Sequence, residues 1–453
     1  MHDVIIIGAG IAGLAAAYEL QQRGLAPLIV EERSRAGGVI VTERVDGYVI
    51  DGGPDSLLVQ KPAALALCNE LGIADRLIPT LPPRTAYVLR GGQLLALPEG
   101  SFLGLPTRLQ PLITAKLFSW PAKARMAAEL AIAVERDAPD ESIGSFMRRR
   151  FGQEAVDYLG DPLLAGIHAG DVNALSIHAL FPRFVELERT HGSVLRALFA
   201  LQTQRRGGSA FVSFPDGIDV LTETLVERLG PGTIRSGATV AEVAGTGPYV
   251  LTLSGGESFT SRAIIAAIPA WRAATALRAV DAELAALCDS IPYTSSATVA
   301  LAVRREQVAH PMAGTGFVVP RRERRSLMAG TWVTAKWPHR APDGQVLLRG
   351  FLGGAHDPQV LDKSDAELIA LAWSDLADVL GMSGSPHLTR VFRWPRASAQ
   401  YNVGHLATVR AIDARLGALP GLYVTGSAYR GTGIPDCVAD ARATATAAAT
   451  FLR

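Results

Sequence analysis

Residues 4–32, VIIIGAGIAGLAAAYELQQRGLAPLIVEE, decide the fold of this chain. The uninterrupted apolar run 4–7 is typical of a strand buried in a parallel sheet, and a second apolar run follows at 28–30. Between them a glycine-rich turn leads into a stretch of small and apolar residues that predicts a helix. The stretch therefore predicts a strand–turn–helix–strand unit, and with it an α/β fold containing a Rossmann-like βαβ domain.

The turn carries Gly8, Gly10 and Gly13 in the pattern G-x-G-x-x-G. The first glycine permits a tight turn, the second lets a pyrophosphate approach the backbone, and the third lets the helix pack against the strand. The helix N-terminus attracts the anion. A chain with 45 glycines produces such triplets by chance, and an ordinary buried turn is the alternative. The strand before the triplet and the helix after it favour a dinucleotide site.

A carboxylate ends the second strand of this unit. Glu31 lies 18 positions after Gly13. A carboxylate at this place accepts hydrogen bonds from ribose hydroxyls and repels a 2′-phosphate. The sequence thus predicts a dinucleotide whose ribose lies at Glu31.

Composition excludes several classes of protein. The 453 residues include 48% hydrophobic and 19% charged residues, which is typical of a large folded core. Lys and Arg (44) nearly balance Asp and Glu (43), so we expect no nucleic-acid partner. The three cysteines have no metal-ligand spacing, and we predict no metal site and a reducing compartment. We expect no signal peptide, no membrane span and a cytoplasmic protein.

Further along the chain, strand and helix patterns alternate in blocks. Gly91-Gly92 and Gly255-Gly256 each separate two apolar stretches, which predicts hairpins. The pattern of residues 233–243, TIRSGATVAEV, predicts one strand. Helical spacing is found at about 100–205, at 365–380 and at about 435–452.

The segments EERSRAGGVI (31–40) and GYVIDGGPDS (47–56) narrow the choice of dinucleotide. In this order they resemble the FAD-binding start of the superfamily that contains amine oxidases, phytoene desaturases and protoporphyrinogen oxidases. The resemblance implies that the pair Gly37-Gly38 passes close to the phosphates and that residues 51–54 approach the flavin ring. NAD needs no such additional loops, so FAD is the cofactor that we predict.

The rest of the chain resembles one branch of that superfamily, the oxygen-dependent protoporphyrinogen or coproporphyrinogen III oxidases of haem biosynthesis. The segments DPLLAGIHAGDVNALSIHALFP (161–182), FRWPRASAQYNVGH (392–405) and AYRGTGIPDCV (428–438) carry the likeness. It implies a six-electron oxidation of a porphyrinogen to the porphyrin by an FAD-dependent oxidase, with O2 as acceptor and H2O2 as product. No catalytic residue is assigned, because the flavin carries the hydride chemistry.

The resemblance also implies a layout of three parts. An FAD-binding domain is expected from residues 1–80, 211–270 and 386–453, and a mixed-sheet substrate domain from 81–98 and 271–385. The helical residues 99–210 are expected to form an insertion that lies on a membrane surface, on the inner face of the plasma membrane.

Residues are carried over from this family one by one. For FAD they are Gly8, Gly10, Ile11, Ala12, Gly13, Glu31, Glu32, Arg33, Gly37, Gly38, Gly52, Gly53, Pro54, Asp55, Val240, Gly426, Gly433 and Ile434. For the substrate they are Arg84, Gly166, Gly316, Val318 and Lys336.

Each substrate assignment has a chemical reason and a plain alternative. A porphyrinogen is an apolar disc with carboxylates at its edge, so Arg84 suits a propionate because its fork holds a carboxylate bidentately. Gly166, Gly316 and Val318 would form the apolar wall, and Lys61 and Lys336 are further candidate cations at the rim. The alternatives are a solvated arginine, ordinary turn and core residues, and exposed lysines.

A second glycine turn, TGSAYRGTGIPDCVADARATA (425–445), leads into the last helix. It lacks the G-x-G-x-x-G register, and Pro435 is expected at the first helical position. The resemblance implies that this helix N-terminus points at the flavin ring, with Gly431, Gly433 and Ile434 as backbone contacts. Its partial positive charge would favour electron density on the reduced ring. The form GIPDC favours a coproporphyrinogen-type oxidase.

Other functions stay open at this stage. One is another flavin amine oxidase or a carotenoid desaturase. A second is a non-catalytic carrier that binds FAD and porphyrin. The expected partners are the porphyrinogen, O2, the next enzyme of the haem pathway, a membrane surface and a second copy of the chain.

Overall fold

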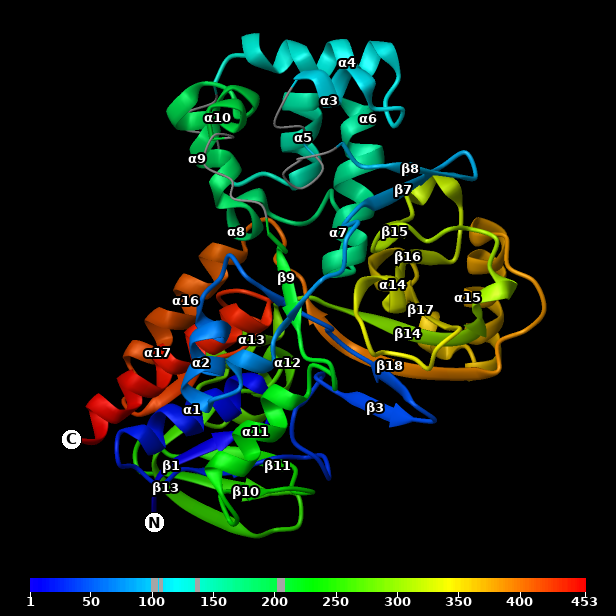
Figure 1. The fold of residues 1–453 in the computed structure, drawn as a ribbon. Coiled ribbons are helices and arrows are strands. Elements are labelled where there is room, and N and C mark those ends of the chain that lie inside the picture. Colours follow the sequence, from blue (N-terminus) through cyan, green and yellow to red (C-terminus); the bar gives the residue numbers. More distant parts are fainter. Residues whose placement is uncertain (99–104, 106–108, 135–138, 202–207) are drawn as a thin grey trace.

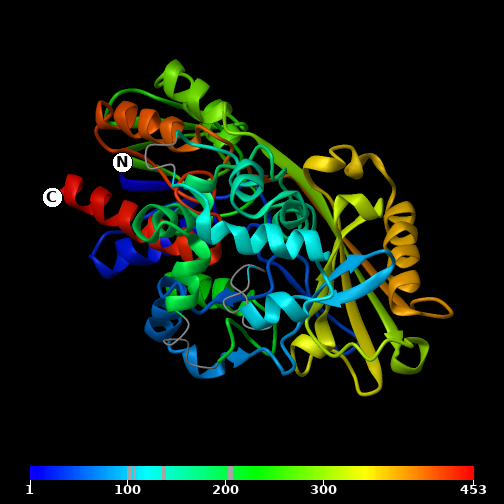
Figure 2. The ribbon, with the colours of Figure 1, turned by 90° about the horizontal axis from the view of Figure 1, so that it is seen from above.

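In the computed structural model, which describes residues 1–98, 105, 109–134, 139–201 and 208–453, two large sheets lie side by side below a layer of helices (Figure 1). Both chain ends belong to the body around the first sheet, where the N- and C-termini come close together (Figures 1 and 2). The structure is mixed α/β, as the sequence predicts.

The first sheet is built around the βαβ unit. Its strand order is β10-β2-β1-β13-β12-β11, and β19 also pairs with β13. Strands β10, β2, β1, β13 and β19 run parallel, while β12 and β11 form antiparallel pairs. The bounds are β1 His2–Ile7, β2 Leu28–Val30, β10 Ile234–Arg235, β11 Val240–Ala244, β12 Tyr249–Leu253, β13 Ser258–Ala266 and β19 Leu422–Val424.

Helices from both ends of the chain pack together on this sheet. Helix α1 (Ile11–Gln22) is buried from Ile11 to Leu20, and its alanines allow α17 (Ile434–Leu452) to lie close against it. Helices α2 (Ala63–Leu71) and α11 (Val220–Leu229) complete this layer. One apolar core therefore joins segments that are more than 400 residues apart in the chain.

The second sheet has the order β18-β14-β17-β16-β15-β7-β8. The predicted hairpin at Gly91-Gly92 is its edge pair β7–β8, and the predicted helix 365–380 is α15, which packs on this sheet. The bounds are β7 Ala86–Arg90, β8 Gln93–Ala96, β14 Tyr293–Arg304, β15 Gly316–Val318, β16 Leu327–Trp332, β17 Gln345–Gly353, β18 Leu388–Ala399 and α15 Asp365–Leu380.

Two small sheets connect these bodies. One is the pair β3 (Thr42–Val45) and β4 (Tyr48–Asp51). In the other, β9 (Phe211–Ser213) lies between β5 (Leu57–Leu58) and β6 (Ile78–Pro79).

The helical layer at the top of Figure 1 comes from the part of the chain for which the sequence predicts helices. Its core is apolar, but it also encloses an ionic group in which the fully buried Arg150 pairs with Glu129 and, at 3.3 Å, with Glu188. The bounds are α3 Leu109–Thr114, α4 Trp120–Ala127, α5 Ile143–Phe151, α6 Gln153–Ala155, α7 Asp161–His168, α8 Ile177–Leu180, α9 Pro182–His191 and α10 Val194–Leu201.

Three details differ from the sequence predictions. The expected strand 233–243 is two strands, because Gly237 adopts a positive φ of 71° between β10 and β11. Strand β18 pairs with β14 in the second sheet, although it lies in the stretch expected in the cofactor domain. Helices α12 (Ala270–Leu277) and α13 (Ala282–Asp289) share a core with the first sheet, although they were expected in the substrate domain.

The described residues include no helix that is long and apolar enough to cross a membrane.

Candidate active site

The first glycine turn has the close approaches that its sequence requires. Gly8 follows the last residue of β1 and has a φ of 99°, and a Cβ there would lie 2.7 Å from the carbonyl oxygen of Ala267. A Cβ on Gly13 would lie 1.9 Å from the carbonyl oxygen of Gly8. Both glycines are therefore needed for the packing of helix and strand, whatever the site binds.

Gly10 is different, because a Cβ built on it meets no atom of the described residues within 4 Å. Gly37 forms a β-bridge with Gly10, and a Cβ on Gly38 would lie 3.2 Å from the Gly10 Cα. The N–H groups of Ile11, Ala12 and Gly13 open the helix and have no acceptor within it. Open space bounded by glycine backbone and by unpaired donors of a helix N-terminus fits a pyrophosphate.

Glu31 lies at the end of β2 with 6% of its surface exposed. One of its carboxylate oxygens accepts from the Ala9 N–H at 2.6 Å and the other from the Arg33 N–H at 2.9 Å. Each oxygen keeps a further lone pair, as a ribose contact requires. The neighbouring Glu32 instead pairs with Arg272 at 3.2 Å, and Arg33 donates to the carbonyl of Gly38.

Val240, the remaining residue predicted at this end of the cofactor, begins β11 and is partly buried. The segment before it pairs with the end of β2, where Ala238 donates to the carbonyl of Glu31 and Gly237 to that of Arg33, both at 2.9 Å. The tertiary structure thus brings Val240 close to Glu31.

The segment from Gly52 to Asp55 is held between the two sheets. A Cβ on Gly53 would lie 2.0 Å from the carbonyl oxygen of Val39, and one on Gly52 would lie 2.4 Å from the ring of Phe392 in β18. Because a side chain would clash at either position, both residues have to be glycine. The close approaches also link residues 52–55 to the 37–40 loop at the phosphate site, so a line of predicted cofactor residues runs from Glu31 to Asp55.

The second glycine turn, which lies before α17 and is called the closing turn below, also lies next to the predicted cofactor residues. Gly426 has a φ of 112°, and a Cβ there would lie 3.8 Å from the Ala12 Cβ at the start of α1. Gly433 is the N-cap of α17, which begins at Ile434, so Pro435 is the second helical residue and not the first as expected.

A tyrosine that the sequence analysis does not single out fixes the closing turn. The Tyr401 hydroxyl accepts from the Gly431 N–H at 2.8 Å and donates to the Ser427 carbonyl at 2.9 Å. Because one hydroxyl bridges both sides of the turn, it sets where the N-terminus of α17 lies.

The structure also brings the predicted substrate residues together. A Cβ on Gly166, in α7, would lie 3.3 Å from Val318 in β15. Gly316 has a φ of 145° and would place a Cβ 2.3 Å from the Gly330 carbonyl, so only glycine fits there. Gly316 pairs with Ala86 of β7, two residues beyond Arg84.

Arg84 is exposed, and its Nε donates to the carbonyl and the hydroxyl of Thr80, both at 3.0 Å. Among the described residues it forms no ion pair. Its two terminal nitrogens therefore remain available to a carboxylate.

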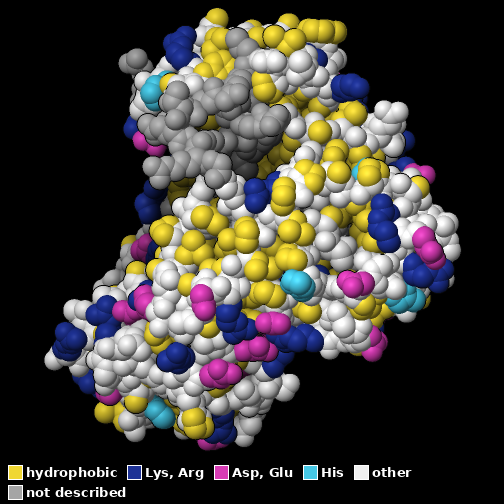
Figure 3. All heavy atoms as spheres, viewed as in Figure 1, with side chains coloured by type: hydrophobic (Ala, Val, Ile, Leu, Met, Phe, Trp, Pro, Cys, Tyr) yellow, Lys and Arg dark blue, Asp and Glu magenta, His cyan; other side chains and the backbone are white. Residues whose placement is uncertain are grey.

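Exposed apolar side chains lie beside Arg84 and Gly166. Ile167 is 59% exposed and Phe211 is 43% exposed. Hydrophobic side chains gather in this part of the molecule, between the helical layer and the first sheet (Figure 3). A large apolar ligand with an acidic edge fits such a surface.

His168 is the last residue of α7, and it lies close to Lys61 and to Asp436 in the first turn of α17. Burial and the nearby charge of Lys61 lower the pKa of His168 to about 4, and Asp436 opposes the shift only in part. The imidazole is therefore neutral at pH 7. Lys61 itself pairs with Asp436 at 2.6 Å.

Lys336, the other predicted rim cation, is also engaged. Its Nζ lies 2.8 and 3.0 Å from the two carboxylate oxygens of Asp55. Arg349 and Arg340 lie in the same buried group, and the sequence analysis did not identify them. A signal was present for Arg349, because it interrupts the apolar strand QVLLRGFLG (345–353).

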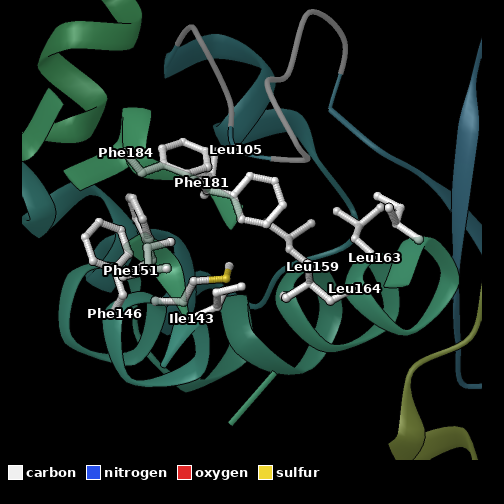
Figure 4. Close-up of a pocket in the computed structure, with 13 residues that line it drawn as sticks. Leu105, Ile143, Phe146, Phe151, Leu159, Leu163, Leu164, Phe181 and Phe184 are labelled. Atoms are coloured by element: carbon white, nitrogen blue, oxygen red, sulfur yellow. The ribbon is translucent and has the colours of Figure 1, made fainter. Parts of the chain in front are cut away.

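The helical layer contains an apolar pocket next to α7, and the exposed Ile167 belongs to its lining (Figure 4). Phe146, Phe151, Phe181 and Phe184 surround it. Among the described residues no group of histidine, cysteine and acidic side chains could hold a metal ion.

Comparison with known proteins identifies the class to which this arrangement belongs. The family model for flavin-containing amine oxidoreductases matches residues 11–449. The chain therefore belongs to the flavin-containing amine oxidoreductase family, and FAD, the cofactor predicted from the sequence, is the flavin of this family.

Within that family the chain belongs with the porphyrinogen oxidases. It is 36% identical to coproporphyrinogen III oxidase of Bacillus subtilis, over 99% of this chain and 98% of the relative. It is 31% identical to the enzyme of the same name from Staphylococcus aureus, over 98% of each chain. It is 30% identical to the chloroplastic protoporphyrinogen oxidase of Nicotiana tabacum, over 99% of this chain and 86% of the relative.

Solved structures agree on the fold. A protein from Exiguobacterium sp. 255-15 that is assigned as a protoporphyrinogen oxidase superimposes with a TM-score of 0.89 at 30% identity, over 99% of each chain. Putrescine oxidase has a TM-score of 0.67 at 17% identity over 98% of each chain, which shows a shared fold alone.

Proposed function

We propose that this protein is an FAD-dependent oxidase that converts coproporphyrinogen III to coproporphyrin III in haem biosynthesis, with O2 as acceptor and H2O2 as product. The observation that carries the proposal is the apolar wall of Gly166 and Val318 together with the Arg84 guanidinium, which forms no ion pair within the described part of the chain. A flat apolar macrocycle with carboxylates at its rim matches that surface.

When it is bound, FAD supplies the hydride acceptance and the reaction with O2. The protein's part is to hold the macrocycle and to keep water away from it. Gly166 and Val318 leave room for a flat face because neither presents a large side chain to the site. The N-terminus of α17 places its partial positive charge at the closing turn, where it stabilises negative charge. The neutral imidazole of His168 adds no competing charge to this region.

Coproporphyrinogen III is the substrate favoured by the pattern of relatives. The Bacillus and Staphylococcus proteins named for it share 36% and 31% of residues with this chain, whereas the two tobacco proteins named protoporphyrinogen oxidase share 30% and 27%. The form GIPDC at 433–437 supports the same choice.

The test is a side-by-side assay of the two porphyrinogens with the FAD-loaded protein. We expect porphyrin fluorescence from both, with a kcat/KM at least about tenfold higher for coproporphyrinogen III, and H2O2 in step with porphyrin. Equal kcat/KM values would contradict the substrate choice. H2O2 from amines would indicate an amine oxidase, and tight porphyrin binding without turnover would indicate a carrier.

We also propose a division of labour among the parts of the chain. The first sheet with α1, α2, α11 and α17 would hold FAD, the second sheet would hold the substrate, and the helical layer would close the site above them. A homodimer and transfer of porphyrin to the next enzyme of the pathway are further parts of this proposal. They rest on the resemblance described above.

We propose that the helical layer docks on an anionic membrane through α3 and α4, which form its outermost edge in Figure 1. Trp120 is 70% exposed, second only to Met1 among the large apolar residues that the structure describes, and Ile113 is 52% exposed, fourth after Ile167. Lys123 lies 4.5 Å from the ring centre of Trp120, and the stretch 109–128 contains no acidic residue. Interfacial tryptophan beside lysine suits a headgroup region.

Replacing Trp120 and Ile113 by Ser is expected to weaken binding to vesicles of phosphatidylglycerol and phosphatidylcholine by about tenfold or more, because burial of each side chain contributes about 1.5–3 kcal/mol. Cosedimentation with the vesicles measures this binding. Phe451→Ser, which changes an exposed aromatic residue at the far end of α17, is the matched control and should bind as the parent does. Unchanged binding of the Trp120/Ile113 variant would remove α3 and α4 as the docking face.

A further inference from the structure

A buried ionic cluster ties the Gly52-Gly53 turn, which follows the small β3–β4 sheet, to the second large sheet. It consists of Asp51, Asp55, Lys336, Arg340 and Arg349, and we call it the clasp. Besides the Lys336–Asp55 contacts, Arg340 lies 3.0 Å from Asp51 and Arg349 lies 3.6 Å from Asp55. The most exposed of the five side chains, Asp55, is only 15% accessible.

The clasp connects different bodies of the protein. Both carboxylates belong to the segment that ends β4 and follows it, whereas the cations come from α14 (Val333–Lys336), the loop after it and β17. Arg349 also donates to the carbonyl of Gly53, and Trp394 in β18 donates to that of Gly52 at 3.1 Å. Side chains of the second sheet thus hold both carbonyls of the glycine turn that faces the cofactor site.

The clasp contains three cations and two carboxylates, so one positive charge is in surplus when both carboxylates are ionised. Burial raises the pKa of Asp51, with Arg340 opposing the shift, and protonation of Asp51 adds to the surplus. Burial opposes ionisation of Asp55, but Lys336 and Arg349 more than offset it and keep the pKa of Asp55 well below its usual range. The buried Nε atoms of Arg340 and Arg349 donate no hydrogen bond within the described residues. Because water screens charges poorly at such depth, the surplus acts on groups nearby.

Lys336 is poorly placed to bind a propionate. Its Nζ contacts both Asp55 oxygens and lies 5.0 Å from the ring centre of Trp337 and 5.8 Å from that of Phe211. Its side chain is 13% accessible. Recruiting Lys336 for a substrate carboxylate would leave Asp55 buried without this partner, which is strongly destabilising.

We propose that Lys336 and Arg349 are positioning residues that hold the segment Gly52–Asp55 against the flavin ring, and that the surplus positive charge of the clasp makes the bound flavin easier to reduce. This inference rests on the FAD-dependent function proposed above. It assigns Lys336 to the cofactor side of the site and not to the substrate.

The test compares two single variants of opposite charge with their double variant. Lys336→Met removes the surplus charge, Asp55→Asn doubles it, and the double variant restores it. In dye-equilibration measurements without substrate, we expect the flavin midpoint potential to fall for Lys336→Met, to rise for Asp55→Asn and to return close to the parent value for the double variant.

Affinities supply the second readout. Each single variant should bind FAD about tenfold or more weakly, since each leaves a buried charge without its partner, whereas the double variant should keep most of the affinity. Lys336→Arg, which keeps the positive charge, should retain the FAD affinity and the midpoint potential of the parent protein. The matched control is Lys363→Met, which breaks an exposed pair with Asp357 and should change neither.

Specific outcomes would overturn the inference. Shifts of the potential in the same direction for both single variants would show that charge does not act as proposed. A KM for the porphyrinogen that rises more than tenfold in Lys336→Met, with an unchanged potential, would make Lys336 a substrate contact. If the double variant did not bind FAD, the Lys336–Asp55 pair would not be the reason why the single variants bind FAD weakly. Absence of porphyrinogen turnover in the parent protein would contradict the proposed function alone, because the potentials are measured without substrate.

Discussion

Gly10→Ala is expected to leave the protein folded but to lower its affinity for FAD by about 100-fold or more, whereas Gly13→Ala is expected to destabilise the fold itself. The two glycines belong to one motif, yet their surroundings are opposite. Within the part of the chain that the structure describes, a Cβ on Gly10 meets no atom within 4 Å, and the φ of −70° at Gly10 is accessible to alanine. The methyl group would therefore occupy only the space that we assign to the pyrophosphate.

At Gly13 the methyl group would instead lie 1.9 Å from the carbonyl oxygen of Gly8, so α1 would have to move away from β1. Overpacking of this kind typically costs about 1–3 kcal/mol and can cost more. Thermal unfolding of the FAD-free proteins and titration with FAD separate the two effects.

Gly417→Ala, at the end of α16 (His405–Gly417) with open space around it, is the matched control and should alter neither property. Full FAD occupancy in Gly10→Ala would place the pyrophosphate elsewhere.

Arg84→Met is expected to raise the KM for coproporphyrinogen III by about 10- to 100-fold while FAD affinity and the unfolding temperature stay unchanged. The hydrogen bond of a charged group contributes about 1.5–3 kcal/mol, which corresponds to that range of KM. The Arg84 guanidinium is exposed, and to the residues that the structure describes it donates only through its Nε. Its loss should therefore weaken mainly the binding of a substrate carboxylate.

Steady-state kinetics with porphyrin fluorescence measures the effect. Arg76→Met is the control, because Arg76 is also exposed, lies eight positions away and pairs with Asp216. If Arg84 contributes to substrate binding, the fold decrease in kcat should be smaller than the fold increase in KM. An unchanged KM would remove Arg84 from the substrate site.

Local features of this chain could be predicted from its sequence because they depend on neighbours in the chain. The glycine turn at 8–13, the hairpin at Gly91-Gly92 and the helix at 365–380 are all present as expected. Glycine sterics, apolar periodicity and capping residues act within a few positions, so the pattern suffices. The expected strand 233–243 was wrong for an equally local reason, since Gly237 turns the chain there.

The resemblance added the family, and the comparisons confirmed it. It could not assign partners to charged residues. Lys336 was expected at the substrate rim, but its partner is Asp55, which lies 281 positions away. Tyr401 was not expected at the closing turn, although it bridges residues 427 and 431.

The sequence by itself thus determined the βαβ unit, the cofactor class and the family. The tertiary structure decided which of 44 cations and 43 carboxylates meet. The physical reason is that an ion pair depends on the distance between atoms brought together by folding, and burial sets its strength. Neither quantity can be read from spacing along the chain, and so the clasp and the exposed guanidinium of Arg84 became visible only in the folded protein.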